Sequence, residues 1–296
     1  MSCYQNEKGY IELLKNIRDT GEYRKTRNGH VYSIFSPMIT FDNIDTCFPL
    51  LTTKKMFIKG IIEELLWFLR GSTNVKELQE KGVHIWDGNS SREYLDSVGL
   101  NTYEVGELGP VYGFQWRYFG KPYKSSTESG FDQIKYIIEE LMKPDNSRRA
   151  VLSAWNPSQL KEMALPPCHL LYTFYKDRNG LSCLMNMRSS DVFLGLPFII
   201  ASTAILTHII AKVLHMNPYK ITIVATDAHL YEEHIGSTDI QLKNNIITPP
   251  LVCIIKEAPY IDSPISEKIE WISSLTLEDF IISNYESAGI IKAPMK

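Results

Sequence analysis

The feature that most constrains the fold of this chain is a long apolar stretch from Phe198 to Met216. Polar residues interrupt this stretch, among them Ser202, Thr207, His208 and Lys212. A membrane span needs about 20 predominantly apolar residues, so these interruptions favour a helix buried in a protein core. The rest of the chain must therefore supply the elements that cover this helix.

Helix-like and strand-like segments surround the stretch without a strict alternation. Apolar residues at helical spacing predict helices at 10–18, 58–69, 75–81, 131–142 and 198–214. Alternating or β-branched runs predict strands at 32–41, 149–155, 169–176, 181–188 and 221–225. Because the order is not a repeated strand–helix–strand unit, we expect an α+β fold with a mixed β-sheet packed with helices.

Composition limits the ligands that such a chain can bind. With 296 residues, 44% hydrophobic and 22% charged, the chain has the composition of a soluble globular protein that can bury a sizeable core. A net charge of −3 gives no overall positive field for nucleic acid. A small anionic ligand would need a local cluster of arginines instead.

The cysteines indicate a reducing compartment. There are five, scattered along the chain, and none forms a CxxC pair. We therefore expect neither a metal site nor a disulfide framework. The N-terminal residues lack the charged-then-apolar pattern of a secretion signal, so a cytoplasmic location, with the nucleus as a variant, is the expectation.

Cys168 differs from the other cysteines in its surroundings. It follows two prolines and precedes His169 in the segment ALPPCH (164–169), at the start of a predicted strand. The prolines fix the backbone and remove two hydrogen-bond donors, which is unusual at a strand start. Nearby cations such as Arg149 and Arg188 would lower the pKa of a thiol and make it a nucleophile. From the residues alone, a structural cysteine at a strand edge is the competing interpretation.

Three further groups have both a functional and a structural interpretation. Glu64 lies in the apolar run IIEELLWFL, where a carboxylate serves either in acid–base chemistry or as a buried ion-pair partner. Arg148 and Arg149 are adjacent and point to opposite faces of a strand, so binding one ligand with both would be easier across a dimer. His229 and Tyr231 are two apart and share a side of an extended chain.

Nine segments together resemble the thymidylate synthase family. They follow the family's order and cover nearly the whole chain: FPLLTTKK (48–55), EELLWFLRGSTN (63–74), IWD (85–87), LGPVYGFQWR (108–117), SRRAVLSAWNP (147–157), MALPPCH (163–169), RSSDVFLGLPF (188–198), DAHLY (227–231) and IKAPM (291–295). Several of these segments are long and specific, so the resemblance favours the nucleophile interpretation of Cys168.

The resemblance implies a fold and a reaction. It implies one catalytic domain over residues 1–296, assembled as a homodimer through the face of its sheet, with no membrane or DNA partner. The reaction would be the reductive methylation of dUMP to dTMP with 5,10-methylenetetrahydrofolate as co-substrate and without a metal. The Cys168 thiolate would add to C6 of the pyrimidine, so that C5 can take the one-carbon unit.

The resemblance also assigns roles to single residues. The catalytic group would be Cys168, Glu64, His169 and Tyr112, with Glu64 organising proton transfer near O4 of the base. The phosphate binders would be Arg27, Arg148, Arg149, Arg188 and Ser189, of which Arg148 and Arg149 come from the other subunit. The base and sugar would contact Ile199, His229 and Tyr231. The folate pocket would comprise Trp86, Asn89, Asp191, Leu194, Gly195 and Phe198.

Several departures from the family pattern fall in this expected pocket. Ile199 replaces an Asn that pairs with N3 and O4 of uracil, which would cost roughly 1–3 kcal/mol and weaken the rejection of cytosine. The other departures are Thr173 and Met187 for Gln, Thr226 for Gly, and a phosphate loop in which Arg27, or less well Arg24, stands for the loop arginine. Lys296 replaces an aliphatic tail, and we expect a looser lid over the folate.

Three functions therefore stay open. The first is thymidylate synthase. The second is a 5-hydroxymethylase acting on dUMP, dCMP or CMP, in which water replaces the hydride, as the altered pocket and C-terminus suggest. The third is a weakly catalytic relative that binds nucleotide or its own messenger RNA. The presence of Cys168 and Glu64 argues against the third, because binding alone needs no thiol.

Overall fold

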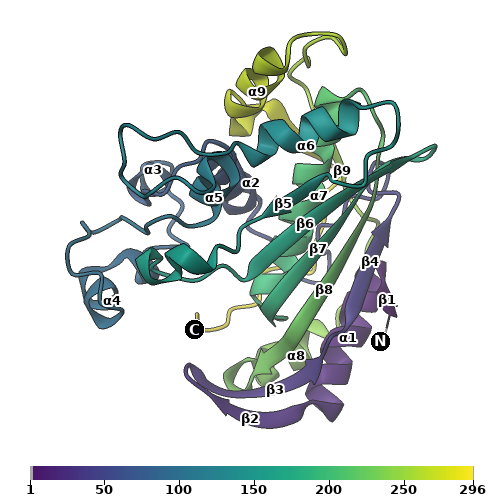
Figure 1. Ribbon diagram of the computed structural model, residues 1–296. Helices are drawn as coiled ribbons and strands as arrows, with labels where there is room; N and C mark the ends of the chain where they lie inside the picture. The colour runs from purple at the N-terminus through teal and green to yellow at the C-terminus, as the bar shows by residue number, and fades with distance from the viewer. Residues whose placement is uncertain (1–2, 296) are drawn as a thin grey trace. The chain divides into compact units, whose positions relative to one another are not determined.

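The computed structural model describes residues 3–295, which fold into two compact units (Figure 1). The first unit comprises the described residues within 1–57, 175–255 and 280–296. The second unit comprises residues 58–174 and 256–279. The chain thus enters each unit more than once. Lys296, on which the expectation of a looser lid rests, lies outside the described residues.

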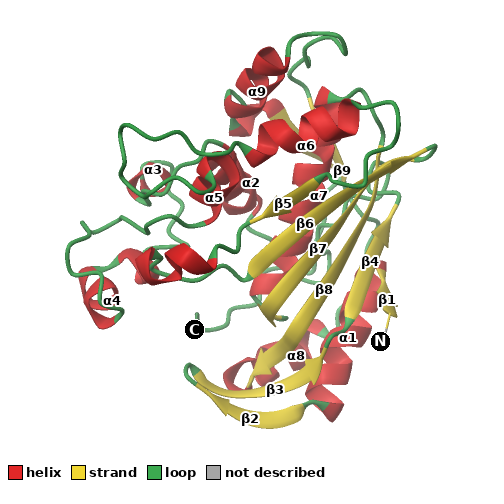
Figure 2. Cartoon of the chain, viewed as in Figure 1, coloured by secondary structure: helices red, strands yellow, loops and turns green. Residues whose placement is uncertain are grey.

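A mixed sheet forms the first unit (Figure 2). Its longest strand, β8 (Pro218–Tyr231), is parallel to β7 (Gly180–Asp191) and antiparallel to β4 (Met38–Asp42). The same sheet also contains β3 (Gly29–Phe35), antiparallel to β8, β2 (Glu22–Thr26), which forms a hairpin with β3, and β1 (Cys3–Gln5), parallel to β4. Parallel and antiparallel pairs in one sheet confirm the predicted mixed sheet of an α+β fold.

Helix α7 (Gly195–Val213) packs on β7 and β8 and corresponds to the predicted core helix. Its polar side chains are bonded within the core: Thr207 Oγ1 donates to the carbonyl of Thr203 at 2.8 Å, and His208 Nε2 donates to the carbonyl of Ile44 at 3.0 Å. Among the described helices, α7 alone has the length and apolarity to cross a membrane, and 83% of its most apolar window is buried in the protein. The apolar stretch is therefore a core helix, as predicted.

Strand alternation decides which sheet residues α7 covers. In β7, Leu181, Cys183, Met185 and Met187 are buried, whereas the residues between them are partly exposed. Successive strand side chains point to opposite faces, so one face of β7 packs on α7 and the other remains accessible. The strand begins at Gly180, where a Cβ atom would lie 2.0 Å from the carbonyl oxygen of Asn217.

The remaining elements of the first unit frame the sheet. They are α1 (Asn6–Thr20), η3 (Glu232–His234), α8 (Ile235–Gln241) and the antiparallel pair β9 (Leu251–Ile254) and β10 (Phe280–Ser283). The carboxylate of Glu7 on α1 accepts hydrogen bonds from the backbone N–H groups of Thr52 and Thr53, each at 2.8 Å. This buried contact fixes the loop that precedes the second unit.

The second unit is mainly helical around an aromatic core. Its elements are α2 (Ile58–Leu69), α3 (Lys76–Gln79), η1 (Gly88–Ser90), α4 (Arg92–Ser97), α5 (Tyr112–Tyr118), α6 (Gln133–Met142), β5 (Val151–Ser153), η2 (Pro157–Glu162), the start of β6 (His169–Asp177), α9 (Ile265–Ser273) and η4 (Leu277–Asp279). Phe68 on α2 contacts the rings of Tyr112 and Trp116 on α5. β5 pairs with β6, with Val151 opposite Thr173.

Candidate active site

The two prolines before Cys168 give its backbone a specific partner. Pro166 and Pro167 carry no N–H group, so the first donor after them is the N–H of Cys168, which donates to Tyr112 Oη at 2.8 Å. The Cys168 side chain is half-buried. Tyr112 at the start of α5 therefore holds the thiol-bearing residue at a fixed place in the second unit.

His169 is buried directly after the cysteine. Its ring lies 5.0 Å from the ring of Tyr112, and its Nδ1 lies 3.2 Å from Tyr172 Oη. Burial lowers the pKa of His169 to about 3, so the imidazole is neutral at physiological pH. A neutral imidazole can relay a proton through hydrogen bonds but does not add a positive charge to the site.

Glu64 on α2 lies in the same group of side chains. Its Oε1 accepts a 2.7 Å hydrogen bond from Trp86 Nε1, and the Trp86 ring lies 6.1 Å from that of Tyr112. Burial raises the pKa of Glu64 to about 7, while the hydrogen bond from Trp86 opposes the rise. At neutral pH the carboxyl group can therefore both donate and accept a proton.

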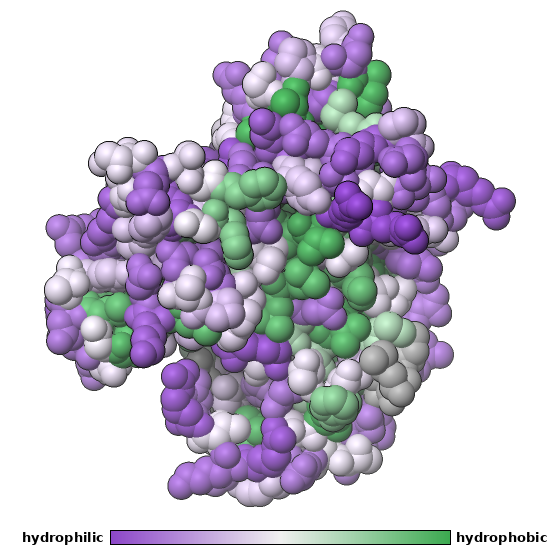
Figure 3. Space-filling view, viewed as in Figure 1, coloured by the Kyte–Doolittle hydropathy of each residue, from purple (hydrophilic) through white to green (hydrophobic). Residues whose placement is uncertain are grey.

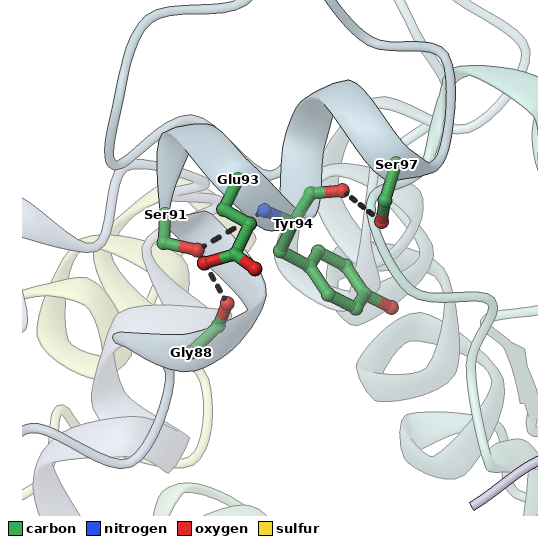
Figure 4. A pocket seen from close by; sticks show the side chains of 5 residues that line it. All are labelled: Gly88, Ser91, Glu93, Tyr94 and Ser97. Atoms are coloured by element: carbon green, nitrogen blue, oxygen red, sulfur yellow. Dashed lines mark hydrogen bonds between the residues drawn. The ribbon is translucent and has the colours of Figure 1, made fainter.

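The other predicted site residues of the second unit are more exposed. Arg148 and Arg149 precede β5 with exposed side chains. Asn89 lies in η1, three residues after Trp86, and is half-buried. A pocket of about 290 Å³ opens beside it (Figure 4) and is lined by Gly88, Ser91, Glu93, Tyr94 and Ser97. Four of these residues hydrogen-bond to one another around the cap of α4, and none of the six residues predicted to contact folate lines this pocket.

In the first unit, the N-terminus of α7 presents one accessible stripe. Leu194, Gly195, Phe198 and Ile199 are half-buried, whereas Leu196, Pro197, Ile200 and Ala201 are buried. The half-buried positions share one side of the helix because of its 3.6-residue period. Four residues that the sequence predicts to contact folate or base therefore lie together on an otherwise buried helix.

Asp191 is fixed at the same end of α7. Its Oδ1 accepts hydrogen bonds from the backbone N–H groups of Phe193 at 2.9 Å and Leu194 at 3.1 Å, and its side chain is 19% exposed. The buried amine of Lys54 lies 3.9 Å from the Phe193 ring centroid and donates to the Phe193 carbonyl. Burial lowers the pKa of Lys54 to about 8, against the opposing effect of Asp191. The sequence had given no reason to single out Lys54.

His229 and Tyr231 lie on β8 with their ring centroids 5.2 Å apart, as the two-residue spacing predicted. His229 Nδ1 lies 3.0 Å from Oδ1 of Asp227, and Arg24 donates to the other carboxylate oxygen at 2.5 Å. The hydrogen bond from His229 is the main cause of the lowered pKa of Asp227. Asp227 was missed, although strand alternation places it on the same face as His229.

The predicted phosphate binders of the first unit lie on two elements. Arg188 and Ser189 are half-buried on β7, where Ser189 is opposite Asp227 of β8. Arg27 is exposed at the turn of the β2–β3 hairpin, and its Nε donates to Asn28 Oδ1 at 3.1 Å. The structure thus brings Arg24, the less favoured candidate, to the Asp227–His229 pair and leaves Arg27 at the hairpin tip.

The sequence pattern of the family described as thymidylate synthase matches residues 8–296. The chain belongs to the thymidylate synthase family. Thymidylate synthase of Saccharomyces cerevisiae is 45% identical over 306 residues, which cover 98% of this chain and 97% of the yeast protein. That of Candida albicans is 44% identical over 98% of this chain and 97% of its own length.

Other family members carry the thymidylate synthase region in a longer protein. The bifunctional dihydrofolate reductase-thymidylate synthase of Zea mays is 47% identical over 259 residues, which cover 86% of this chain. The match covers 50% of the maize protein, so this chain spans about half the length of such relatives.

The residues at the end of β7 fit the folate that thymidylate synthases use. A carboxylate held by two backbone N–H groups keeps an oxygen for the N–H donors of a pterin ring. The apolar stripe of Leu194, Phe198 and Ile199 suits the ring's faces. Within residues 3–295, no cluster of three or more His, Cys, Asp or Glu side chains is arranged to hold a metal ion.

Proposed function

We propose that the chain is a methyltransferase that converts dUMP to dTMP with 5,10-methylenetetrahydrofolate. The observation that carries the proposal is Cys168 held by Tyr112 in one group with the Glu64–Trp86 pair. Membership of the thymidylate synthase family supports it. The hydroxymethylase alternative has no support from these relatives.

The chemistry begins at Cys168. Its thiolate adds to C6 of the uracil, a carbon–sulfur bond forms, and the C5–C6 double-bond electrons move to C5 and O4. When bound, 5,10-methylenetetrahydrofolate supplies the carbon for C5 and then the hydride that makes it a methyl group. Between the transfer of the carbon and the transfer of the hydride, C5 loses its proton. The carbon–sulfur bond to Cys168 breaks to release the product.

Glu64 manages the proton at O4 in this proposal. Because its pKa lies near 7, it can give a proton as negative charge develops on O4 and take it back later at little energetic cost. Neutral His169 packs against Tyr112 in the same group of side chains and adds no positive charge to the site.

The remaining roles follow the family residue by residue. Arg27, Arg188 and Ser189 bind the phosphate, because arginine forms charge-assisted, often bidentate bonds with phosphate oxygens. His229 and Tyr231 bind the sugar 3′-hydroxyl, with His229 oriented by Asp227. The folate contacts are Trp86, Asn89, Asp191, Leu194, Gly195 and Phe198, and Ile199 faces the base.

A second copy of the chain completes the protein in this proposal. The face of β7 and β8 opposite α7 carries Leu184, Thr222 and Val224, and Leu184 is 38% exposed. Figure 3 shows apolar side chains gathered over these strands. Pairing of two such faces would bury them and let Arg148 and Arg149, both exposed, bind the partner's phosphate. We also propose a cytoplasmic location, since no disulfide joins Cys47, Cys168, Cys183 or Cys253 within the described residues.

The proposed reaction is tested by product analysis. The purified protein is incubated with dUMP or dCMP and 5,10-methylenetetrahydrofolate. The masses of the nucleotide products are measured by mass spectrometry, and dihydrofolate formation is followed by absorbance. We expect dTMP and dihydrofolate in equal amounts, no turnover in Cys168→Ser, and normal turnover in the control Cys183→Ser. Hydroxymethylated product without dihydrofolate would establish the alternative.

A further inference from the structure

A fully buried histidine, His234, contacts the C-terminal segment of the first unit. It is the last residue of η3, and its side chain is 0% exposed. Its Nε2 lies 2.8 Å from the carbonyl oxygen of Pro294. Because a carbonyl oxygen only accepts hydrogen bonds, Nε2 carries the proton in this pair. The ring is therefore a fixed donor to residues near the end of the chain.

The other side of the same ring faces Asp191. His234 Nδ1 lies 3.7 Å from Asp191 Oδ1, the oxygen that accepts from Phe193 and Leu194. This distance exceeds that of a direct hydrogen bond, and the ring attracts the carboxylate electrostatically only when Nδ1 also carries a proton. The His234 ring also packs against Phe193 at 5.5 Å and Tyr231 at 5.3 Å between centroids. One side chain thus joins the C-terminal segment to two predicted ligand-binding residues.

A second hydrogen bond holds the same segment. Ser237 Oγ on α8 donates to the carbonyl oxygen of Lys292 at 2.7 Å. Both contacts reach main-chain carbonyls, whereas the side chains of Ile290 and Met295 are each 72% exposed. His234 and Ser237 therefore both hold the main chain of residues 290–295.

We propose that His234 is a positioning residue that latches residues 290–295 and fixes the Asp191 carboxylate with the same ring. The proposal rests on the proposed function, in which Asp191 binds the pterin ring of the folate. A folate that engages Asp191 then stabilises the latched segment, and the latched segment keeps water from the carbon being transferred. His234 acts through Asp191 and the segment and need not touch either substrate.

Two measurements on His234→Leu test this proposal. The first is deuterium uptake by residues 286–296 in the free protein, which needs no substrate. We expect uptake about tenfold faster than in the unsubstituted protein, because the bond to Pro294 is lost. The second is steady-state turnover. We expect the KM for 5,10-methylenetetrahydrofolate to rise about tenfold, the KM for dUMP to change less than about twofold, and hydroxymethylated product to appear.

Matched variants separate a latch from a merely structural residue. His234→Gln places an amide donor near Pro294 and should restore slow uptake and most of the folate affinity. Ser237→Ala, at a half-buried site that tolerates a smaller side chain, should speed uptake without changing the folate KM as much. His215→Asn, in the exposed turn after α7 where its φ of 54° suits Asn, should match the unsubstituted protein in both measurements.

The outcomes distinguish this proposal from the proposed function. Uptake and folate KM in His234→Leu equal to those of the unsubstituted protein would overturn the latch. If His234→Leu does not fold, unchanged uptake in Ser237→Ala, or fast uptake in His234→Gln, would overturn it instead. If the unsubstituted protein makes no dTMP, the proposed function fails, and the uptake measurement still decides whether His234 holds the segment.

Discussion

Trp86 Nε1 donates a 2.7 Å hydrogen bond to Glu64 Oε1, and this bond opposes the burial that raises the pKa of Glu64 to about 7. Indole can donate but never accept, so the pair favours the ionised carboxylate. The bond therefore sets the pH range over which Glu64 can exchange a proton with the substrate.

Replacing Trp86 with Phe should shift the pH dependence of turnover. Without the indole donor the pKa of Glu64 rises above about 7, so the limb of the kcat profile that follows ionisation of Glu64 moves to higher pH. The measurement is kcat against pH at saturating substrates. Trp271→Phe is the control, because Trp271 Nε1 donates to the carbonyl of Glu257 in the same unit. Identical profiles for both variants would contradict the assignment.

Replacing Glu64 with Gln should lower kcat and raise the free energy of unfolding at pH 8. The folded pKa of Glu64, about 7, is raised above its ordinary value of 4.5, so the folded state binds the proton more tightly than the unfolded chain. The free energy of unfolding therefore falls as pH rises from about 4.5 to 7, by on the order of 3 kcal/mol from this group. Glutamine does not ionise, so Glu64→Gln lacks this fall in the free energy of unfolding.

Urea unfolding at pH 5 and pH 8 measures this effect. Glu64→Gln should gain stability relative to the unsubstituted protein at pH 8 and much less at pH 5, while kcat falls by roughly 10²–10⁴-fold. An equal pH dependence of unfolding in both proteins would show that Glu64 is not held as the structure describes.

Mixing two inactive variants should restore activity if the protein is a dimer with shared sites. Cys168→Ser lacks the nucleophile and Arg149→Ala lacks a donated phosphate ligand. A mixed dimer has one site with the intact cysteine of one subunit and the intact arginine of the other. Random exchange of subunits should recover about a quarter of full activity. Activity that stays at the sum of the two variants would place Arg149 in its own subunit's site or outside it.

Replacing Ile199 with Asn should sharpen the choice of base. Ile199 lies on the accessible stripe of α7 and cannot hydrogen-bond to a pyrimidine edge. An amide at this position can read N3 and O4 of uracil, so the ratio of kcat/KM for dUMP over dCMP should rise by about tenfold or more. Competition between the two nucleotides in one reaction measures the ratio directly. A ratio unaffected by the substitution would mean that Ile199 does not face the base.

Periodicity in the sequence predicted several of the long amphipathic or apolar elements, although it missed α9. The helix expected at 198–214 is Gly195–Val213, and the strand expected at 181–188 is Gly180–Asp191. The short elements α4, α8 and η3 were missed, because they are set by caps and local contacts and lack a long apolar period. For example, Ser91 caps α4 by accepting from the N–H of Tyr94.

In the candidate site, too, the sequence pointed to some residues and missed others. Cys168, Glu64 and His229 stood out because their residue type is unusual in its local pattern. Asp227, Lys54 and His234 did not, because their importance lies in contacts with residues that are distant in sequence or on other elements, such as the bond of His234 to Pro294. Chain periodicity carries no information about such pairs.

The central claim, that Cys168 attacks C6 of a pyrimidine nucleotide, is most directly tested by trapping the adduct. With 5-fluoro-dUMP and 5,10-methylenetetrahydrofolate, the reaction should stop before C5 loses its substituent, because fluorine cannot leave as a proton does. We predict that the intact protein gains the mass of both ligands and that the peptide containing Cys168 carries them, while Cys168→Ser gains nothing. A protein without added mass, or an adduct on Cys47, Cys183 or Cys253, would contradict the account.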